Sequence, residues 1–311
     1  MKKAIVLLLC LSVLIGCAGG GEPQGVRGGV QENFRVGSEG IRMFFTPGVP
    51  TDRLFDTEEF NALVELENVG AHDAGAAGDR VYLSGFDSRV ITGIPSGGVP
   101  IPPLEGKNQF NPRGSRDTVS FKGQIAKITG DVVPQPLLAT LCYRYKTEAT
   151  TNVCIDPDPF SPGIRTKVCE PGPVGLGDQA APVAVTNIEV EPRRGKTGFR
   201  IRIRNVGGGA PFRNDASALG RCNPQERLKF NEVDFVEVTD VKVGGISVRS
   251  SCRPLDRGHV RLDPTSGQGE FYCEFTTTGS ATFLSPITID LTYGYRSTIQ
   301  HSLVIIKTDI D

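Results

Sequence analysis

The chain contains two copies of one sequence pattern. Residues 121–155 align without a gap on residues 271–305, at a constant offset of 150. Within this block, Leu-Cys-Tyr-Arg-Tyr at 141–145 aligns with Leu-Thr-Tyr-Gly-Tyr at 291–295. Upstream, Val-Glu-Leu-Glu-Asn-Val-Gly at 64–70 aligns with Ile-Arg-Ile-Arg-Asn-Val-Gly at 201–207, at an offset of 137. The fold must therefore accommodate one set of elements twice, with a loop that is 13 residues longer in one copy.

Each aligned block has the pattern of a β-strand. Val64 and Leu66 alternate with Glu65 and Glu67, so one face is apolar and the other is charged. Runs of Val, Ile, Thr and Phe are separated by Gly and Pro throughout the chain, and no long stretch has helical periodicity. The Asn-Val-Gly sequences are expected to end strands, since Asn and Gly tolerate left-handed backbone conformations. The chain is predicted to be all-β.

The repeat predicts two consecutive β-domains. We assign residues 36–160 to the first domain and 182–311 to the second, with a linker rich in Pro and Gly at 161–181. Residues 93–116 are expected to form a long loop in the first domain, and 207–230 an insertion in the second. Such insertions often carry binding sites.

The strand register predicts a disulfide. If residues 139–146 and 150–155 form a hairpin around Glu148, Cys142 and Cys154 face each other on the outer face. Cys252 and Cys273 are expected to join parts of the second domain, which leaves Cys169 and Cys222 to pair by elimination.

The N-terminus resembles that of prokaryotic lipoproteins. Lys2 and Lys3 precede an apolar stretch of twelve residues, Ala4 to Ile15, which is too short to span a bilayer. The sequence Leu-Ile-Gly-Cys at 14–17 stands at its end. The resemblance implies a signal peptide at 1–16, a lipid on Cys17 and a flexible tether at 17–35. The alternative is an ordinary signal peptide with an incidental cysteine. Lipidation implies attachment to the cell membrane on its extracytoplasmic side, where disulfides persist.

The two Asn-Val-Gly blocks resemble the CARDB modules of prokaryotic cell surfaces. Arg-Val-Tyr-Leu-Ser-Gly-Phe-Asp at 80–87 fits the strand that follows in those modules. The whole arrangement is similar to uncharacterised archaeal surface lipoproteins. This resemblance implies two tandem immunoglobulin-like β-sandwich domains and a place in the cell envelope, and it implies no catalytic residues.

Sequence motifs for chemistry are few. We interpret His72, His259 and His301 as surface histidines, because none has ligands at metal-binding spacing. Asp156 and Asp158 could offer carboxylates to calcium, but a rigid linker is the preferred interpretation. The sequence predicts no metal, no cofactor and no catalysis. Removing residues 1–16 changes the formal net charge from −1 to −3, which does not indicate nucleic-acid binding.

Charges on the aligned strands are reversed between the copies. Glu65 and Glu67 stand where Arg202 and Arg204 stand, and Arg200 extends the basic row. One hypothesis is contact between these opposed faces, and another is binding of an anionic envelope polymer or lipid by the arginines; two unrelated solvated faces are the alternative. The predicted function is a structural, adhesive or assembly-binding role in the envelope. The alternative is a glycan-binding or accessory subunit of an envelope enzyme.

Overall fold

The computed structural model describes residues 34–160 and 167–308, and these residues are almost entirely β-strands. They belong to one compact unit, Asn33–Asp311. Residues 1–33, which include the predicted signal peptide and Cys17, lie outside the described residues. The predicted all-β class is confirmed.

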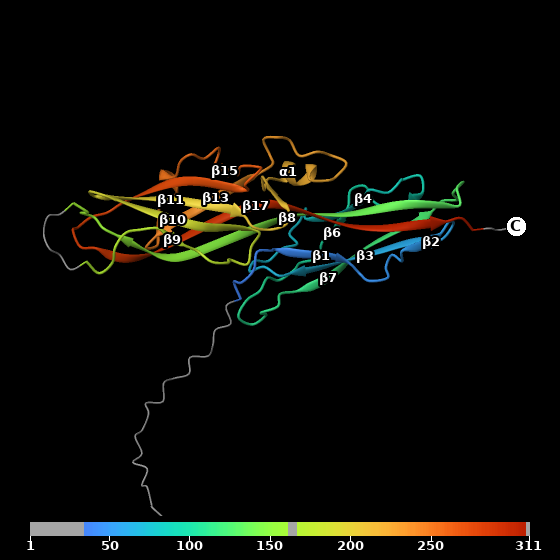
Figure 1. Ribbon diagram of the computed structural model, residues 1–311, viewed down its shortest axis with the longest axis horizontal. Helices are drawn as coiled ribbons and strands as arrows, with labels where there is room; N and C mark the ends of the chain where they lie inside the picture. The colour runs from blue at the N-terminus through green and yellow to red at the C-terminus, as the bar shows by residue number, and fades with distance from the viewer. Residues whose placement is uncertain (1–33, 161–166, 309–311) are drawn as a thin grey trace, which may run out of the picture. The chain divides into compact units, whose positions relative to one another are not determined.

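Two long antiparallel strands form the centre of the unit (Figure 1). β8 (Val132–Ile155) and β17 (Phe283–Ile306) have 24 residues each and pair along their whole length. Arg144 lies opposite Gly294, which is also its counterpart in the 150-residue repeat. The repeat therefore has an approximate two-fold axis through this pair, and the axis exchanges the two strands.

Two four-stranded antiparallel sheets carry the Asn-Val-Gly strands. In both, the central strands alternate between buried and exposed positions, as period-two burial requires. The first sheet has the order β1 (Ile41–Phe45), β3 (Glu59–Asn68), β7 (Arg116–Ile125), β5 (Ile91–Thr92). The second has the order β16 (Gln268–Thr276), β11 (Lys196–Asn205), β10 (Val183–Arg193), β9 (Val174–Gly175).

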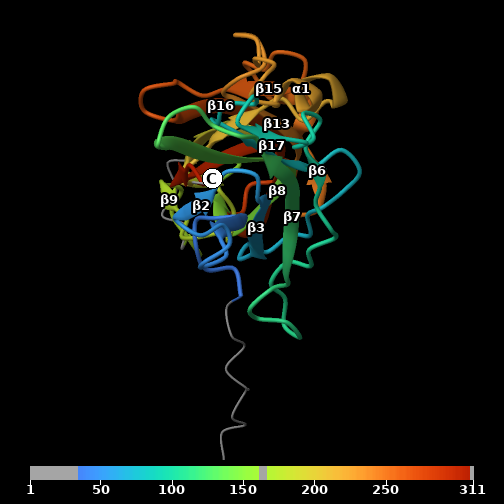
Figure 2. The same cartoon turned by 90° about the vertical axis from the view of Figure 1, so that its right-hand side faces the viewer.

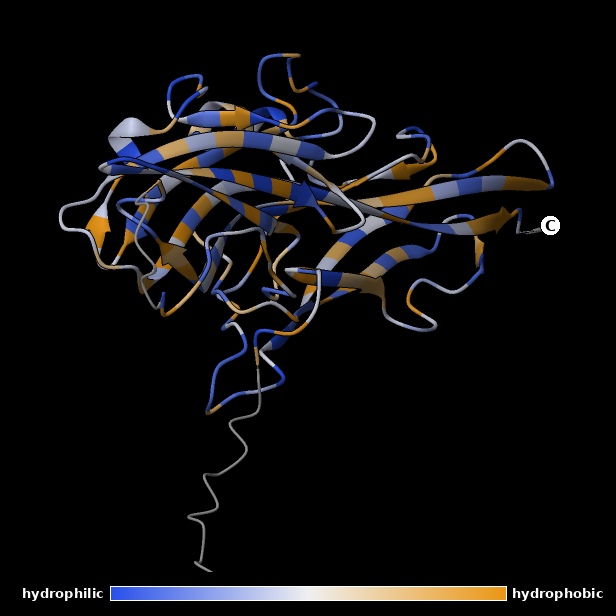
Figure 3. Ribbon diagram, turned by 60° about the vertical axis from the view of Figure 1, so that its left-hand side comes forward, coloured by the Kyte–Doolittle hydropathy of each residue, from blue (hydrophilic) through white to orange (hydrophobic). Residues whose placement is uncertain are grey.

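The third sheet contains both long strands and packs against the other two (Figures 1 and 2). Its main path is β14 (Ile246–Ser247), β13 (Phe235–Val243), β17, β8, β4 (Arg80–Ser84), β6 (Val99–Pro100). β2 (Arg53–Phe55) and β12 (Ala210–Phe212) pair with β17, and β15 (His259–Arg261) pairs with β13. Apolar and polar residues alternate along the long strands, and the apolar ones join a single core (Figure 3).

Each long strand serves both halves of the unit. β4 pairs with β8 at residues 138–142, in the first half, whereas β13 pairs with β17 at 287–292, in the second. The other end of each strand crosses the axis. Residues 150–155 of β8 lie beside 283–288 of β17, and residues 132–137 lie beside 301–306. The sandwich-like halves thus exchange strands reciprocally.

This arrangement corrects the predicted hairpin around Glu148. β8 continues through Glu148 as an extended strand, and Glu148 lies opposite Asp290 of β17. Residues 137–151 contain no Gly, Pro, Asn or Asp, so nothing in the sequence favours a turn there. Where the sequence predicts two consecutive domains, residues 33–311 belong to one compact unit, and its core continues through both halves.

Two predicted connections are more structured than expected. Within the predicted linker, residues 161–166 lie outside the described residues, but β9 pairs with β10 and Ala180 and Ala181 are fully buried. Within the predicted loop 93–116, Ile101 and Leu104 are buried and fill part of the core. The insertion at 207–230 contains the short helix α1 (Ala216–Arg221), which begins after the N-cap Asp215.

Candidate functional site: the junction of the two repeats

Four tyrosines from the long strands meet at the two-fold axis. Tyr143 lies opposite Tyr295, and Tyr145 lies opposite Tyr293. Neighbouring rings contact edge to face, with centroids 5.7 to 6.2 Å apart. All four side chains are buried, so their hydroxyl groups need hydrogen-bond partners inside the protein.

The Asn-Val-Gly sequences supply partners for two of these hydroxyls. Tyr145 Oη donates to Asn68 Oδ1 at 3.1 Å and accepts from the backbone amide of His72 at 3.2 Å. In the other repeat, Tyr295 Oη donates to Asn205 Oδ1 at 3.0 Å. Each asparagine also donates its Nδ2 to a backbone carbonyl four residues later. The repeated motif therefore fixes a loop against a tyrosine.

The other two tyrosines bond to the first residues of strands β1 and β10 in the flanking sheets. Tyr143 Oη accepts from the backbone amide of Ile41 at 3.2 Å, and Tyr293 Oη accepts from that of Val183 at 3.3 Å. Burial raises the pKa of Tyr143, Tyr145 and Tyr293 well above the ordinary tyrosine value. Burial also raises the pKa of Tyr295, to about 12. All four are neutral at physiological pH.

The glycine of the motif is needed for close approach. A Cβ at Gly70 would lie 1.9 Å from Tyr145 Oη, and one at Gly207 would lie 2.4 Å from Tyr295 Oη. Neither glycine has a positive φ. The expected left-handed conformation is therefore wrong, and lack of a side chain is what the position requires.

An insertion of the second repeat covers part of the outer face of β8 and β17. The 207–230 insertion lies over Cys142 and is joined to it by the Cys142–Cys222 disulfide, whose Cα atoms are 6.1 Å apart. Leu219 of α1 packs with Tyr82 and Phe212 over this disulfide. The predicted Cys142–Cys154 pair is thus wrong, because residues 150–155 follow β17 instead of turning back.

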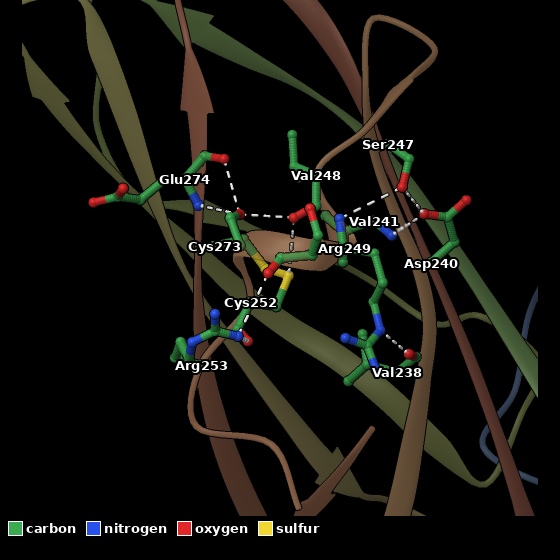
Figure 4. The surroundings of a disulfide bond; sticks show 12 residues. Val238, Asp240, Val241, Ser247, Val248, Arg249, Cys252, Arg253, Cys273 and Glu274 are labelled. Atoms are coloured by element: carbon green, nitrogen blue, oxygen red, sulfur yellow. Dashed lines mark hydrogen bonds between the residues drawn. A yellow bond between two sulfur atoms is a disulfide. The ribbon is translucent and has the colours of Figure 1, made fainter. Parts of the chain in front are cut away.

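The remaining cysteines also form disulfides. Cys154 is bonded to Cys169, so the predicted Cys169–Cys222 pair is wrong as well. The predicted Cys252–Cys273 disulfide is confirmed. It joins β16 to the end of the 3₁₀ turn at Arg249–Ser251 (Figure 4). Ser251 Oγ donates to the carbonyl of Glu274 at 2.9 Å.

An open hollow of about 480 Å³ lies on the same outer face, over the two central strands. It is bounded by the loop after Asn-Val-Gly in the first repeat, by β8 and β17, and by the start of the insertion. Its polar lining consists of two carboxylates, two cations, an amide and a hydroxyl: Asp73, Asp79, Arg144, Lys146, Asn214 and Thr292. A hollow of this size suits a small molecule.

One carboxylate of the hollow is fully paired. Asp79 is buried and accepts hydrogen bonds from the backbone amides of Ala76 and Arg144 and from Arg144 Nε, at 3.0 to 3.3 Å. Burial raises the pKa of Asp79, while Arg144 opposes that shift. This pair forms a fixed wall of the hollow.

In the part of the lining that comes from the second repeat, Asn214 is held in place by Glu237 and Thr292. Asn214 Nδ2 donates to Glu237 Oε2 at 2.8 Å and to Thr292 Oγ1 at 3.0 Å. Burial raises the pKa of Glu237, but the hydrogen bonds from Asn214 and Thr292 outweigh burial and lower it overall. Glu237 therefore remains ionised and fixes the amide.

The three histidines are half-buried, in contrast to the predicted surface positions. His72 packs edge to face on Tyr145, and burial lowers the pKa of His72. His259 contacts Arg213, and burial together with this cation lowers its pKa. His301 Nε2 lies 3.5 Å from Asp52. In the described part of the chain, no group of three or more His, Cys, Asp or Glu is placed to hold a metal.

The two aspartates considered for calcium have basic partners instead. Asp156 is buried, and its Oδ2 accepts from Lys167 Nζ at 2.7 Å. Asp158 lies 3.7 Å from Arg194. Nothing in this pair of contacts resembles a calcium site of six or more oxygens.

The charge-reversed faces each contain their own counterions. Arg116 forms ion pairs with Glu65 at 2.9 Å and with Glu67 at 3.1 Å. Arg202 pairs with Glu270 at 2.9 Å, and this hydrogen bond lowers the pKa of Glu270. Arg200 Nη2 lies 2.8 Å from Glu191. Arg204 is exposed and pairs with no described residue.

No model of a known protein family matches the chain, and no curated protein has a similar sequence. Within residues 34–160 and 167–308, no helix has the length and apolar character needed to cross a membrane.

Proposed function

We propose that the chain is a lipid-anchored, extracytoplasmic protein of the cell envelope with a structural or adhesive role and no catalysis. In this proposal two immunoglobulin-like, CARDB-type sandwiches have become one body by exchanging strands. The reciprocal sharing of β8 and β17 is the observation that carries the structural role. A body with one continuous core transmits position and load better than two domains on a flexible linker.

The disulfides support the location outside the cytoplasm. All six cysteines of the described residues are paired, and such bonds persist in oxidising compartments. The lipobox-like sequence at 14–17 supports a lipid on Cys17. In this proposal the charged faces have two candidate partners. One is an envelope protein, and the other is an anionic polymer that binds Arg200, Arg202 and Arg204.

Metabolic labelling with a radioactive fatty acid tests the anchor. The wild-type chain is expected to take up label and to enter the detergent phase, whereas Cys17→Ser is expected to do neither. Cys10→Ser is the matched control, because Cys10 lies in the segment removed with the signal peptide. Labelled Cys17→Ser, or wild-type protein in the aqueous phase, would contradict the proposal. Crosslinking in intact cells then identifies the neighbours.

The second candidate is a binding subunit for a glycan. The hollow at the junction favours it, because binding proteins place a few polar groups around a concave surface. Its test is the carbohydrate arm of the titration described below.

A further inference from the structure

The two repeats differ in what covers the long strands at the hollow. Thr292, at the hollow, stands 150 residues after Cys142, which lies under the insertion. The insertion therefore covers Cys142 itself and leaves a hollow of about 460 Å³ beside Cys222, whereas the hollow at Thr292 lies over the strands without such a cover.

The two repeats also differ in the size of the side chains near the axis. In the second repeat, Phe212 packs so tightly on Gly294 that a Cβ there would lie 2.3 Å from the ring. The counterparts in the first repeat are Gly75 and Arg144, and both line the hollow. An aromatic ring on a glycine has been replaced by an open space beside a guanidinium group.

Two charged groups in the hollow keep unused hydrogen-bonding capacity. Lys146 Nζ forms ion pairs with Asp290 at 3.4 Å and with Glu148 at 3.8 Å, and Asp290 Oδ1 accepts no hydrogen bond from it. Asp73 is exposed, accepts one bond from the amide of Gly106 at 2.9 Å, and has no ion pair within the described residues. The hollow therefore offers a cation and a carboxylate, both accessible.

The charge balance selects the ligand class. Among the residues that line the hollow, two carboxylates, Asp73 and Asp79, stand beside two cations, Arg144 and Lys146, and Lys146 also forms ion pairs with Asp290 and Glu148 outside the lining. A multiply charged anion would meet carboxylates without compensation, and a simple cation would meet Arg144 and Lys146. A small molecule with both charges satisfies both sides. Ala74 and Ala76 add apolar surface beside Asp73.

We propose that this hollow binds a small zwitterion of the α-amino-acid class. The ligand's ammonium group pairs with Asp73, and its carboxylate accepts hydrogen bonds from Lys146 and Arg144. Its side chain lies toward Ala74 and Ala76. This inference goes beyond the envelope role and does not depend on the lipid anchor.

The test is a set of NMR titrations of the whole mature chain in detergent. L-alanine is the zwitterionic probe, propionate and n-propylammonium carry one charge each, and galacturonate carries a carboxylate with sugar hydroxyls. We expect L-alanine to shift the amide signals of Thr292 and Lys146 and to bind at least about tenfold more tightly than either singly charged probe. Absence of an alanine response, or equal binding of propionate, overturns the proposal. Binding of galacturonate alone also overturns it and favours the glycan candidate.

Variants locate the site. Lys146→Gln and Asp73→Asn should each weaken alanine binding by about tenfold, and Asp73→Asn keeps an acceptor for the Gly106 amide. Lys122→Gln and Asp117→Asn are matched controls on β7, where Asp117 also accepts one backbone amide. Equal loss in the control variants, or none in the hollow variants, contradicts this placement.

Discussion

The two equivalent sites on the outer face of the long strands are covered differently. At Cys142 a disulfide and α1 pack apolar side chains on the sheet, with a hollow of about 460 Å³ beside Cys222, whereas at Thr292 a hollow of about 480 Å³ lies directly over the two strands. The tyrosines below the two sites keep nearly the same hydrogen bonds. The comparison teaches that the buried side of the junction preserves the repeat, and that the outer side has diverged through one loop.

The largest effect should come from separating the halves. Residues 34–160 and 167–308, with the cysteines of the Cys142–Cys222 and Cys154–Cys169 pairs replaced by serine, should not form stable monomers alone. Each half would lack the strand segment that the other contributes. Co-expression should restore a one-to-one complex, as measured by light scattering and circular dichroism. Two well-folded monomeric halves would show that sharing is dispensable.

Two of the disulfides can be compared by how much each stabilises the fold. Cys142→Ser with Cys222→Ser opens a link between residues 80 apart, and Cys252→Ser with Cys273→Ser one between residues 21 apart. The expected losses in unfolding free energy are about 4 and about 3 kcal/mol, since longer loops lose more entropy when linked. Denaturant titration measures both. An unchanged midpoint for the first pair would mean that the cover over Cys142 contributes nothing.

The symmetry of the buried side predicts equal costs for two hydroxyls. Tyr145→Phe and Tyr295→Phe should each lower stability by about 1–2 kcal/mol, because each leaves buried partners unsatisfied. Tyr82→Phe is the control, since the hydroxyl of Tyr82 bonds to no described residue. Urea unfolding that finds one hydroxyl neutral would break the proposed equivalence.

Alkaline titration tests how strongly burial holds Tyr295 in its neutral form. The pKa of Tyr295 is raised to about 12, so the folded state favours its neutral form. The stabilisation is complete below the ordinary tyrosine pKa near 10 and is lost as pH rises from there toward 12. Wild type should lose about 1.4 kcal/mol per pH unit more than Tyr295→Phe in this range. Parallel stability curves would contradict it.

The charged faces should show the smallest effect. Arg204→Glu should change stability by less than about 1 kcal/mol, because the side chain is exposed and unpaired within the described residues. Arg202→Glu should cost slightly more, since it also loses Glu270. Sedimentation of both variants tests the predicted contact between faces. A change in self-association would support that contact, and no change would argue against it.

The repeat, the alternating strands and the Cys252–Cys273 bond could all be predicted from the sequence, because each depends on local pattern. The exchange of strands could not be predicted from periodicity. A hairpin around Glu148 and an extended β8 both place Tyr143 and Tyr145 on the core face, so burial alternation is the same in either case. The absence of turn residues at 137–151 was the one available signal.

The hollow was missed for a related reason. Asp73, Lys146 and Asn214 are far apart in sequence and meet only because the repeats share a sheet. Nothing in the local sequence indicates that Gly70 serves close packing, since its partner Tyr145 lies on another strand. Long-range pairing decides both features.

Disulfide mapping of the mature protein tests the sharing of strands most directly. Non-reducing proteolysis followed by mass spectrometry should recover a peptide pair joined through Cys142 and Cys222 and another through Cys154 and Cys169. A peptide pair joined through Cys142 and Cys154 would require β8 to fold back on itself and would contradict the account.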